Sequence, residues 1–164
     1  MVKGMRRKAL AALSAVAAVL WLGAVDAAEQ GFRKLKERDK CPVCGMFVSK
    51  YPDWVAEVVF KDGTYAAFDG PKDLYKYLLG MKHYAPGRED RDIGAVYVTD
   101  YYSLHPVNGR SAFYVTGSDV LGPMGRELVP FERETDAREF LKDHKGRKVL
   151  RFGEITADEL KSLD

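Results

Sequence analysis

The pattern of hydrophobic and polar positions predicts short strands and amphipathic helices in a regular order. Residues 53–60 (DWVAEVVF) are rich in β-branched side chains, the turn signal KDG follows, and residues 65–69 (YAAFD) resume the apolar run. Two such runs around a glycine-containing turn are typical of a β-hairpin. Residues 70–80 (GPKDLYKYLLG) have apolar side chains at helical spacing between a Gly-Pro start and a Gly end, which predicts a helix. A further strand is predicted in residues 93–102 (IGAVYVTDYY).

The second half of the chain repeats this order. Residues 111–118 (SAFYVTGS) and 126–131 (RELVPF) have strand character, 134–146 (ETDAREFLKDHKG) has helical periodicity, and 147–152 (RKVLRF) predicts a closing strand. The halves align without gaps at a constant offset of 63, which pairs Phe68 with Phe131, Asp73 with Asp136, Tyr77 with Phe140 and Leu78 with Leu141.

The repeated order predicts an α+β fold in which two tandem ββαβ repeats pack into one compact domain. We place the first repeat at residues 41–105 and the second at 106–164. A single unit of roughly 50 residues would bury too little surface to be stable alone. The alternative is chance similarity between two amphipathic segments. The halves differ in their hairpin loops, because the second has the long loop 117–125 (GSDVLGPMG).

The first 27 residues predict a secretory signal peptide. Four Lys and Arg residues precede a largely apolar run, and Val25 and Ala27 stand at positions −3 and −1 of a cut before Ala28. The alternative is an uncleaved membrane anchor. The exit has no cysteine, so lipoprotein processing is not expected. Residues 28–40 are a charged leader, and the predicted location is the periplasm.

Charge and composition exclude several classes of function. Without the signal peptide, which has four basic residues and one acidic residue, the formal net charge of +2 becomes −1. This balance gives no basic footprint for a nucleic acid partner. We find no Ser/His/Asp set, no acidic pair at helical spacing and no phosphate-binding glycine loop, and therefore predict that the protein is not an enzyme.

The chemistry of the chain is concentrated in residues 41–47 (CPVCGMF), which contain its two cysteines. A redox dithiol is one reading, but the pair precedes a strand, whereas reactive pairs usually lie at a helix N-terminus. Structural zinc needs four ligands, and the chain has no second cysteine pair and no His-x(3–5)-His spacing. A disulfide between Cys41 and Cys44 would close a very small ring and contribute little stability.

A soft-metal site is the interpretation that we favour over the redox dithiol. Thiolate and thioether ligands together select Cu(I), and Cys44 and Met46 would share one face of a strand entering through Gly45. Met124 stands at a loop tip in the sequence GPMG, where an apolar side chain is unusual unless it docks on the core. If pseudo-symmetry brings the two loops together, Cys44, Met46 and Met124 form an open three-sulfur site. Cys41 and, as a nitrogen donor, His105 are further candidate ligands.

The motifs DKCPVCGM, YAAFD, YVTGSDVLGPMGRELVPF and DAREFLKDHKG together resemble the NosL family over roughly residues 39–155. The resemblance implies an exported Cu(I)-binding metallochaperone with a duplicated ββαβ fold similar to that of organomercurial lyases. It also implies a client copper enzyme, nitrous oxide reductase, or the membrane-bound machinery that matures it. The alternative function is a periplasmic thiol-disulfide oxidoreductase that uses Cys41 and Cys44. Many family members are lipoproteins, from which this sequence departs.

Overall fold

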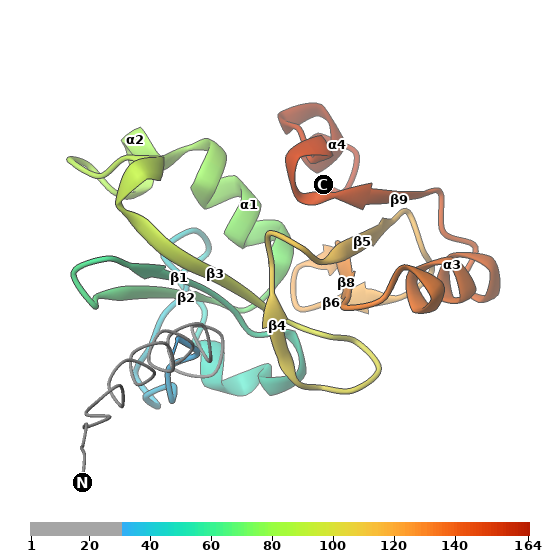
Figure 1. Ribbon diagram of the computed structural model, residues 1–164, viewed down its shortest axis with the longest axis horizontal. Helices are drawn as coiled ribbons and strands as arrows, with labels where there is room; N and C mark the ends of the chain where they lie inside the picture. Colours follow the sequence, from blue (N-terminus) through green and yellow to red (C-terminus); the bar gives the residue numbers. More distant parts are fainter. Residues whose placement is uncertain (1–30) are drawn as a thin grey trace, which may run out of the picture.

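The computed structural model describes residues 31–164, which form a mixed α/β structure of two units side by side (Figure 1). The predicted signal peptide therefore lies outside the described residues. The first unit contains, in chain order, β1 (Ala56–Phe60), β2 (Tyr65–Phe68), α1 (Pro71–Leu79), α2 (Met81–Tyr84), β3 (Ile93–Thr99) and β4 (Pro106–Asn108).

The first unit is an antiparallel sheet in the order β2-β1-β3-β4, with α1 packed against β1 and β2. The predicted hairpin is present. Its turn is stabilised by Asp62, whose Oδ1 accepts the Thr64 N–H at 2.9 Å, and by Gly63 in the left-handed region at φ 84°. All five residues of β1 are buried, which places this strand at the centre of the unit.

The second unit has a three-stranded antiparallel sheet in the order β8-β5-β9 and a separate two-stranded hairpin, β6–β7. Its elements are β5 (Phe113–Thr116), β6 (Leu121–Gly122), β7 (Gly125–Arg126), β8 (Val129–Phe131), α3 (Glu134–Asp143), β9 (Lys148–Arg151) and α4 (Ala157–Lys161). Short 3₁₀ helices, written η, complete the described chain: η1 (Val48–Lys50), η2 (Pro52–Trp54), η3 (Asp90–Asp92) and η4 (Phe152–Glu154).

The two units share one topology. In each sheet the first strand is flanked by the second strand and by the strand that follows the helix, giving β2-β1-β3 and β8-β5-β9. This layout fits the predicted ββαβ order in both halves. That the halves arose by duplication stays a prediction.

The first sheet extends a few residues past the predicted boundary between the repeats. Residues 106–108, which we expected to open the second repeat, form β4 and pair with β3 through the register Val98↔Val107. The pairing covers the edge of β3 and buries Val107, which is why this segment belongs to the first sheet.

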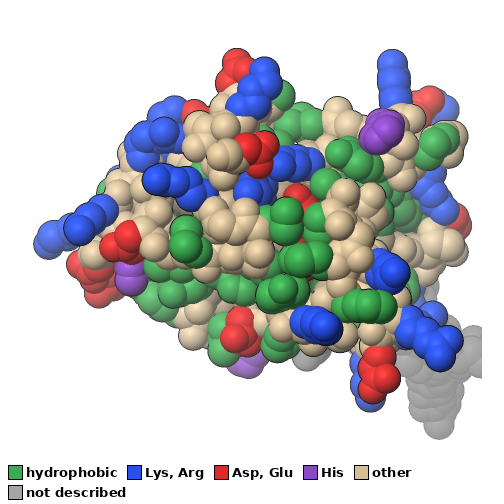
Figure 2. Space-filling model, turned by 180° about the vertical axis from the view of Figure 1, so that it is seen from behind, with side chains coloured by type: hydrophobic (Ala, Val, Ile, Leu, Met, Phe, Trp, Pro, Cys, Tyr) green, Lys and Arg blue, Asp and Glu red, His purple; other side chains and the backbone are tan. Residues whose placement is uncertain are grey.

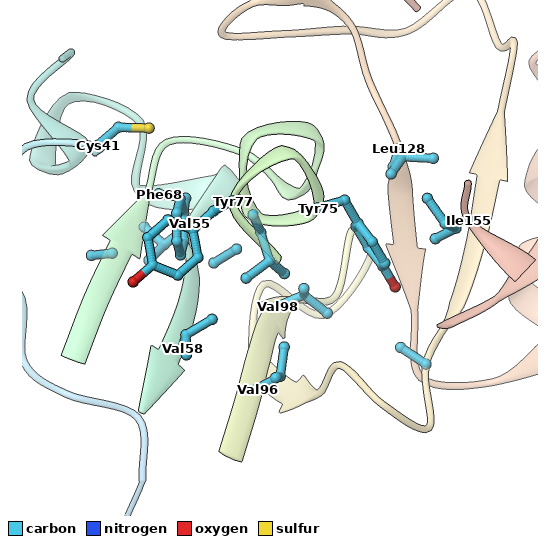
Figure 3. Close-up of a cluster of buried hydrophobic side chains, with 14 of the residues drawn as sticks. Cys41, Val55, Val58, Phe68, Tyr75, Tyr77, Val96, Val98, Leu128 and Ile155 are labelled. Carbon is cyan, nitrogen blue, oxygen red and sulfur yellow. The ribbon is translucent and has the colours of Figure 1, made fainter. Parts of the chain in front are cut away.

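A shared core joins the units. The larger cluster of buried side chains includes Cys41, Phe68 and Tyr75 from the first unit, together with Leu128 and Ile155 from the second (Figure 3). A smaller cluster, made of Val115, Val129, Phe131, Ala137 and Phe140, lies between α3 and its sheet. The larger cluster explains why the two units pack as one domain.

The surface mixes charged and apolar side chains. Figure 2 shows one face on which hydrophobic side chains gather near the middle, with Lys and Arg both among them and along the outline. Among the residues that the structure describes, the large hydrophobic side chains that are exposed are Phe47, Leu79, Tyr102, Leu104, Leu121 and Met124. Within residues 31–164, the structure contains no helix with the length and apolar character needed to cross a bilayer.

Candidate metal centre

A tight turn presents the two cysteines. Gly45 N–H donates to Cys41 O at 2.9 Å and Cys41 N–H donates to Met46 O at 2.9 Å, while Lys40 and Phe47 form an antiparallel bridge. Gly45 has φ 80°, a conformation that favours glycine and that lets the chain reverse here. The sequence C-x-x-C-G is therefore folded into a closed loop that holds both thiols close together.

The junction between β2 and α1 lies against this turn and supplies two carboxylates. Asp69 follows the last residue of β2, and Asp73 lies in the first turn of α1. Both are almost fully buried, at 0% and 2% exposure. Buried carboxylates are unusual unless they are hydrogen-bonded or bind a cation, so their position beside the thiols is informative.

The four side chains form one cluster. Cys41 Sγ lies 3.3 Å from Asp73 Oδ2, and Cys44 Sγ lies 3.2 Å from Asp69 Oδ1. One potential ligand atom from each of the four residues lies within 4.8 Å of all the others. Asp69 Oδ2 is buried and has no hydrogen-bond partner among the described residues, which leaves a donor atom available to a cation.

The surroundings keep both thiols protonated at neutral pH. Burial raises the pKa of Cys44 to about 11, and hydrogen bonds to Asp69 and Asp73 raise it further than burial alone would. Burial likewise raises the pKa of Cys41 well above its usual range, with Asp73 adding to the shift. A cation that binds as a thiolate complex must therefore displace these protons.

Cys44 gives access to the cluster. It is half-buried, whereas Cys41, Asp69 and Asp73 are almost completely buried. Figure 3 shows Cys41 in its loop at the edge of the hydrophobic core. An incoming ligand from another molecule would therefore reach the centre beside Cys44.

The four-residue cluster contradicts two statements that we based on the sequence. The objection to zinc was that a four-ligand set was absent, but two thiols and two carboxylates supply four donors that zinc accepts. The statement that no acidic pair has helical spacing is also wrong, because Asp69 and Asp73 are four residues apart.

Met46 lies next to the turn but not as predicted. Residues 44–46 are not a strand, so Cys44 and Met46 do not share a strand face; Cys44 belongs to the turn and Gly45 reverses the chain. The Met46 sulfur accepts a hydrogen bond from Tyr51 Oη at 3.8 Å. Met46 as a metal ligand stays a prediction.

Met124 lies in the two-residue loop of the β6–β7 hairpin and is 42% exposed to solvent. The hairpin reaches the first turn of α1, where Lys72 Nζ donates to Met124 O at 2.9 Å. The helix turn that carries Asp73 therefore also holds the backbone of Met124. This position agrees with the idea that the two loops approach each other, and the thioether as a ligand stays a prediction.

His105 is exposed in the loop before β4 and is not part of the cluster. Asp69 and Asp73 were missed as candidate ligands. The signal for them was an acidic residue directly after an apolar strand, followed by a second one a helical turn later.

The fold and the site define a mixed α/β protein with a partly buried cysteine–carboxylate cluster that could hold a metal ion. A model of the NosL family matches residues 32–160, and the chain therefore belongs to the NosL family. This confirms the resemblance seen in the sequence motifs.

Two relatives illustrate the membership. The chain is 32% identical over 126 residues to the copper-binding lipoprotein NosL of Stutzerimonas stutzeri; the match covers 73% of this chain and 63% of the relative, so the chain spans less than two thirds of its length. Its structure is similar to that of the copper chaperone NosL from Shewanella denitrificans, with a TM-score of 0.66 and 28% identity over 77% of this chain and 96% of that one. Both relatives are described as copper proteins and neither as an enzyme, which agrees with the prediction of a non-enzymatic role.

Proposed function

We propose that this chain is an exported Cu(I)-binding metallochaperone that delivers copper for the maturation of a copper enzyme. The observation that carries the proposal is the cluster of two thiols and two carboxylates, with Cys44 as its accessible member. The copper-binding and copper-chaperone relatives support copper rather than another soft cation as the cargo. The predicted signal peptide supports the periplasm as the place of action.

The geometry suits a carrier because one side of the centre stays accessible. Cys41 and Cys44 supply thiolates to the ion, Met46 and Met124 are the predicted thioether ligands, and the carboxylates take part in removing the thiol protons. A thiolate or imidazole of the receiving protein can then enter beside Cys44 and take the ion by ligand exchange.

The decisive experiment is titration of the reduced protein with Cu(I) against a chromogenic chelator, with Zn(II) as competitor. We expect one Cu(I) per chain and little displacement by zinc, because thiolate and thioether donors favour Cu(I). A Cys41→Ser/Cys44→Ser double variant is the matched control and should bind neither ion tightly. Equal occupancy by zinc and copper in competition would contradict a copper-selective carrier.

The same titration on oxidised protein tests the role of the thiols. A Cys41–Cys44 disulfide removes both thiolates, so we expect Cu(I) binding to be lost and restored by reduction. Copper binding that is unchanged after oxidation would show that the cysteines are not ligands.

The oxidoreductase alternative is not favoured by the surroundings of the thiols. Reactive dithiols have lowered pKa values, whereas burial raises the pKa of Cys44 to about 11. We therefore expect no acceleration of insulin reduction by the reduced protein. Disulfide-exchange activity that disappears in Cys44→Ser, with copper binding intact, would instead support a redox role.

The proposed client is nitrous oxide reductase, reached directly or through its membrane-bound maturation machinery. Incubating the Cu(I)-loaded protein with the copper-free reductase should transfer copper to the reductase in the presence of a competing chelator. Free Cu(I) at the same concentration is the control and should be captured by the chelator. Equal transfer in both reactions would argue against a delivery role.

A further inference from the structure

A buried lysine lies beside the metal centre. Lys72 is 2% exposed and directly precedes Asp73 in α1. Its Nζ donates to Met124 O at 2.9 Å and to Leu163 O at 3.4 Å, and lies 3.6 Å from Asp164 Oδ1. A buried ammonium group is costly unless it is well hydrogen-bonded, so this set of partners is what keeps Lys72 in place.

The backbone of Lys72 is held from the second unit as well. Its N–H donates to Glu127 Oε1 at 2.6 Å, and the same oxygen accepts the Leu128 N–H at 2.9 Å. Glu127 thus acts as the cap of α1, whose own N-cap residue, Gly70, has no side chain to do so. Gly70 and Gly122 leave room for this carboxylate, because a Cβ on either would lie 2.4 Å or 2.9 Å from Glu127 atoms.

The hairpin that carries Met124 needs an external tie. Each of its strands, β6 and β7, has two residues, and an isolated two-stranded ribbon of this size is marginal in water. The hydrogen bond from Lys72 is made to the tip residue itself. It therefore restrains the part of the hairpin that presents the Met124 side chain.

We propose that Lys72 is a positioning residue for copper binding, which holds the Met124 loop against the first turn of α1. The inference rests on the proposed function, since Met124 has this role only if the centre binds copper. Two thiolates and one Cu(I) ion together carry one negative charge, so the positive charge of Lys72 could itself favour binding, and the test has to separate this charge effect from the placement of the loop.

Lys76 provides a matched control one helical turn further along α1. Its Nζ lies 2.6 Å from Asp164 Oδ1, the same carboxylate oxygen that lies near Lys72, and the structure records no bond from it to the Met124 loop within the described residues. Lys76→Met removes the same charge from the same helix. A purely electrostatic effect would therefore appear in both lysine variants.

The test compares Cu(I) affinity in the wild type, Lys72→Met, Lys76→Met, Met124→Ala and the Lys72→Met/Met124→Ala double variant. We expect Lys72→Met to weaken binding roughly 10- to 100-fold, as is common for groups that orient a metal ligand, and Lys76→Met to change it by less than about threefold. In the Met124→Ala background, Lys72→Met should have no further effect. Equal losses in both backgrounds, equal effects of the two lysine variants, or a Met124→Ala variant with wild-type affinity would each overturn the proposal.

A second measurement reads the loop without copper. Hydrogen exchange of the amides in residues 121–126 should be faster in Lys72→Met than in the wild type and unchanged in Lys76→Met; unchanged exchange in Lys72→Met would overturn the proposal. Circular dichroism establishes that the variants are folded, and Lys72→Gln, which is shorter and uncharged, replaces Lys72→Met if that variant is not. A wild type that binds no Cu(I) would refute the proposed function, and the exchange result would still decide whether Lys72 holds the loop.

Discussion

Protonated thiols should make the proposed copper binding at this cluster dependent on pH. Cys44 keeps its proton at any pH well below its pKa of about 11, and the more deeply buried Cys41 is protonated in the same range. In the proposed complex Cu(I) binds the thiolate, so protons compete with the ion. Affinity should therefore rise with pH between about 6 and about 8, by up to about tenfold per pH unit for each thiol that loses its proton. Calorimetric titrations in buffers of different ionisation enthalpy should count about two protons released per Cu(I).

The matched variant for this prediction is Cys44→Ser, which removes one titrating thiol. It should release one proton fewer and bind Cu(I) more weakly, because a hydroxyl oxygen is a poor ligand for a soft ion. Affinity that is independent of pH in the wild type would show that the ion does not bind as a thiolate complex.

Truncation of Met124 distinguishes between two roles for this residue, copper ligand and packing side chain. If Met124 is a ligand, the Met124→Ala substitution should lower Cu(I) affinity by about an order of magnitude or more. It should leave the free energy of unfolding almost unchanged, because the residue is 42% exposed. A packing methionine would instead lose about 2–5 kcal/mol of stability on truncation and leave copper binding intact. Chelator competition and chemical denaturation of the same variant measure the two quantities.

Leu121→Ala is the control for Met124→Ala, because Leu121 lies on the same hairpin and is 64% exposed but has no sulfur. It should leave both copper affinity and stability near the wild-type values. A loss of copper affinity as large as that of Met124→Ala would mean that any truncation on the hairpin disturbs the site.

Single helices and strands were predictable where the residues that determine them, such as turn and cap residues, lie next to them in the sequence. The β1–β2 hairpin follows from the Asp-Gly turn, and α1 begins and ends at the predicted glycines, Gly70 and Gly80. The two carboxylates of the cluster were not predictable in the same way. Asp69 and Asp73 form a cluster with the cysteines only because the β2–α1 junction packs against the cysteine turn. This contact joins segments more than 20 residues apart, so local sequence does not reveal it.

The cap of α1 gives a prediction at the scale of the element. Gly70→Ala would place a Cβ 2.4 Å from Glu127 Oε2, so the carboxylate must move away from the Lys72 N–H that it accepts. We expect a loss of about 1–3 kcal/mol of unfolding free energy, from the weakened cap and the steric strain. Chemical denaturation of the metal-free protein measures this loss.

Gly153→Ala is the matched control, because no described atom lies within 4 Å of the added Cβ and Gly153 is not in the left-handed region. It should change stability by less than about 0.5 kcal/mol. Equal losses in the two alanine variants would show that Glu127 does not stabilise the start of α1 in the way the geometry indicates.

At the scale of the whole molecule, the two units meet at the candidate metal site, and each contributes residues to its surroundings. The cysteine turn and the β2–α1 junction come from the first unit, whereas Glu127 and the Met124 hairpin come from the second. Sequence periodicity gave the order of elements in each unit. It could not give the contacts between the units, because these depend on single buried polar side chains such as Lys72 and Glu127 rather than on a repeating pattern.

Buried carboxyl groups in both units make stability depend on pH. Burial raises the pKa of Glu127 to about 8 and that of Glu57 to about 7, although each accepts a backbone N–H. The folded protein therefore holds protons that the unfolded chain has released above pH about 4.5. The resulting stabilisation is complete below the unfolded pKa and is lost as the pH rises through the folded value, by at most about 1.4 kcal/mol per pH unit for each group.

Unfolding free energy of the reduced, metal-free protein should thus fall between pH 5 and pH 8, with the contribution of Glu57 exhausted near pH 7 and that of Glu127 near pH 8. Glu127→Gln isolates one contribution, because an amide oxygen can still accept the Lys72 and Leu128 N–H groups but has no charge to bury. Denaturant titrations at intervals across this range should give a shallower pH slope for Glu127→Gln than for the wild type. The difference should be largest between about pH 5.5 and about pH 7, midway between the unfolded and folded pKa values of Glu127, and should fade above about pH 8. A slope that is the same in both proteins would mean that Glu127 ionises in the folded state as readily as in the unfolded chain, held by its two backbone donors and the nearby Lys72 ammonium.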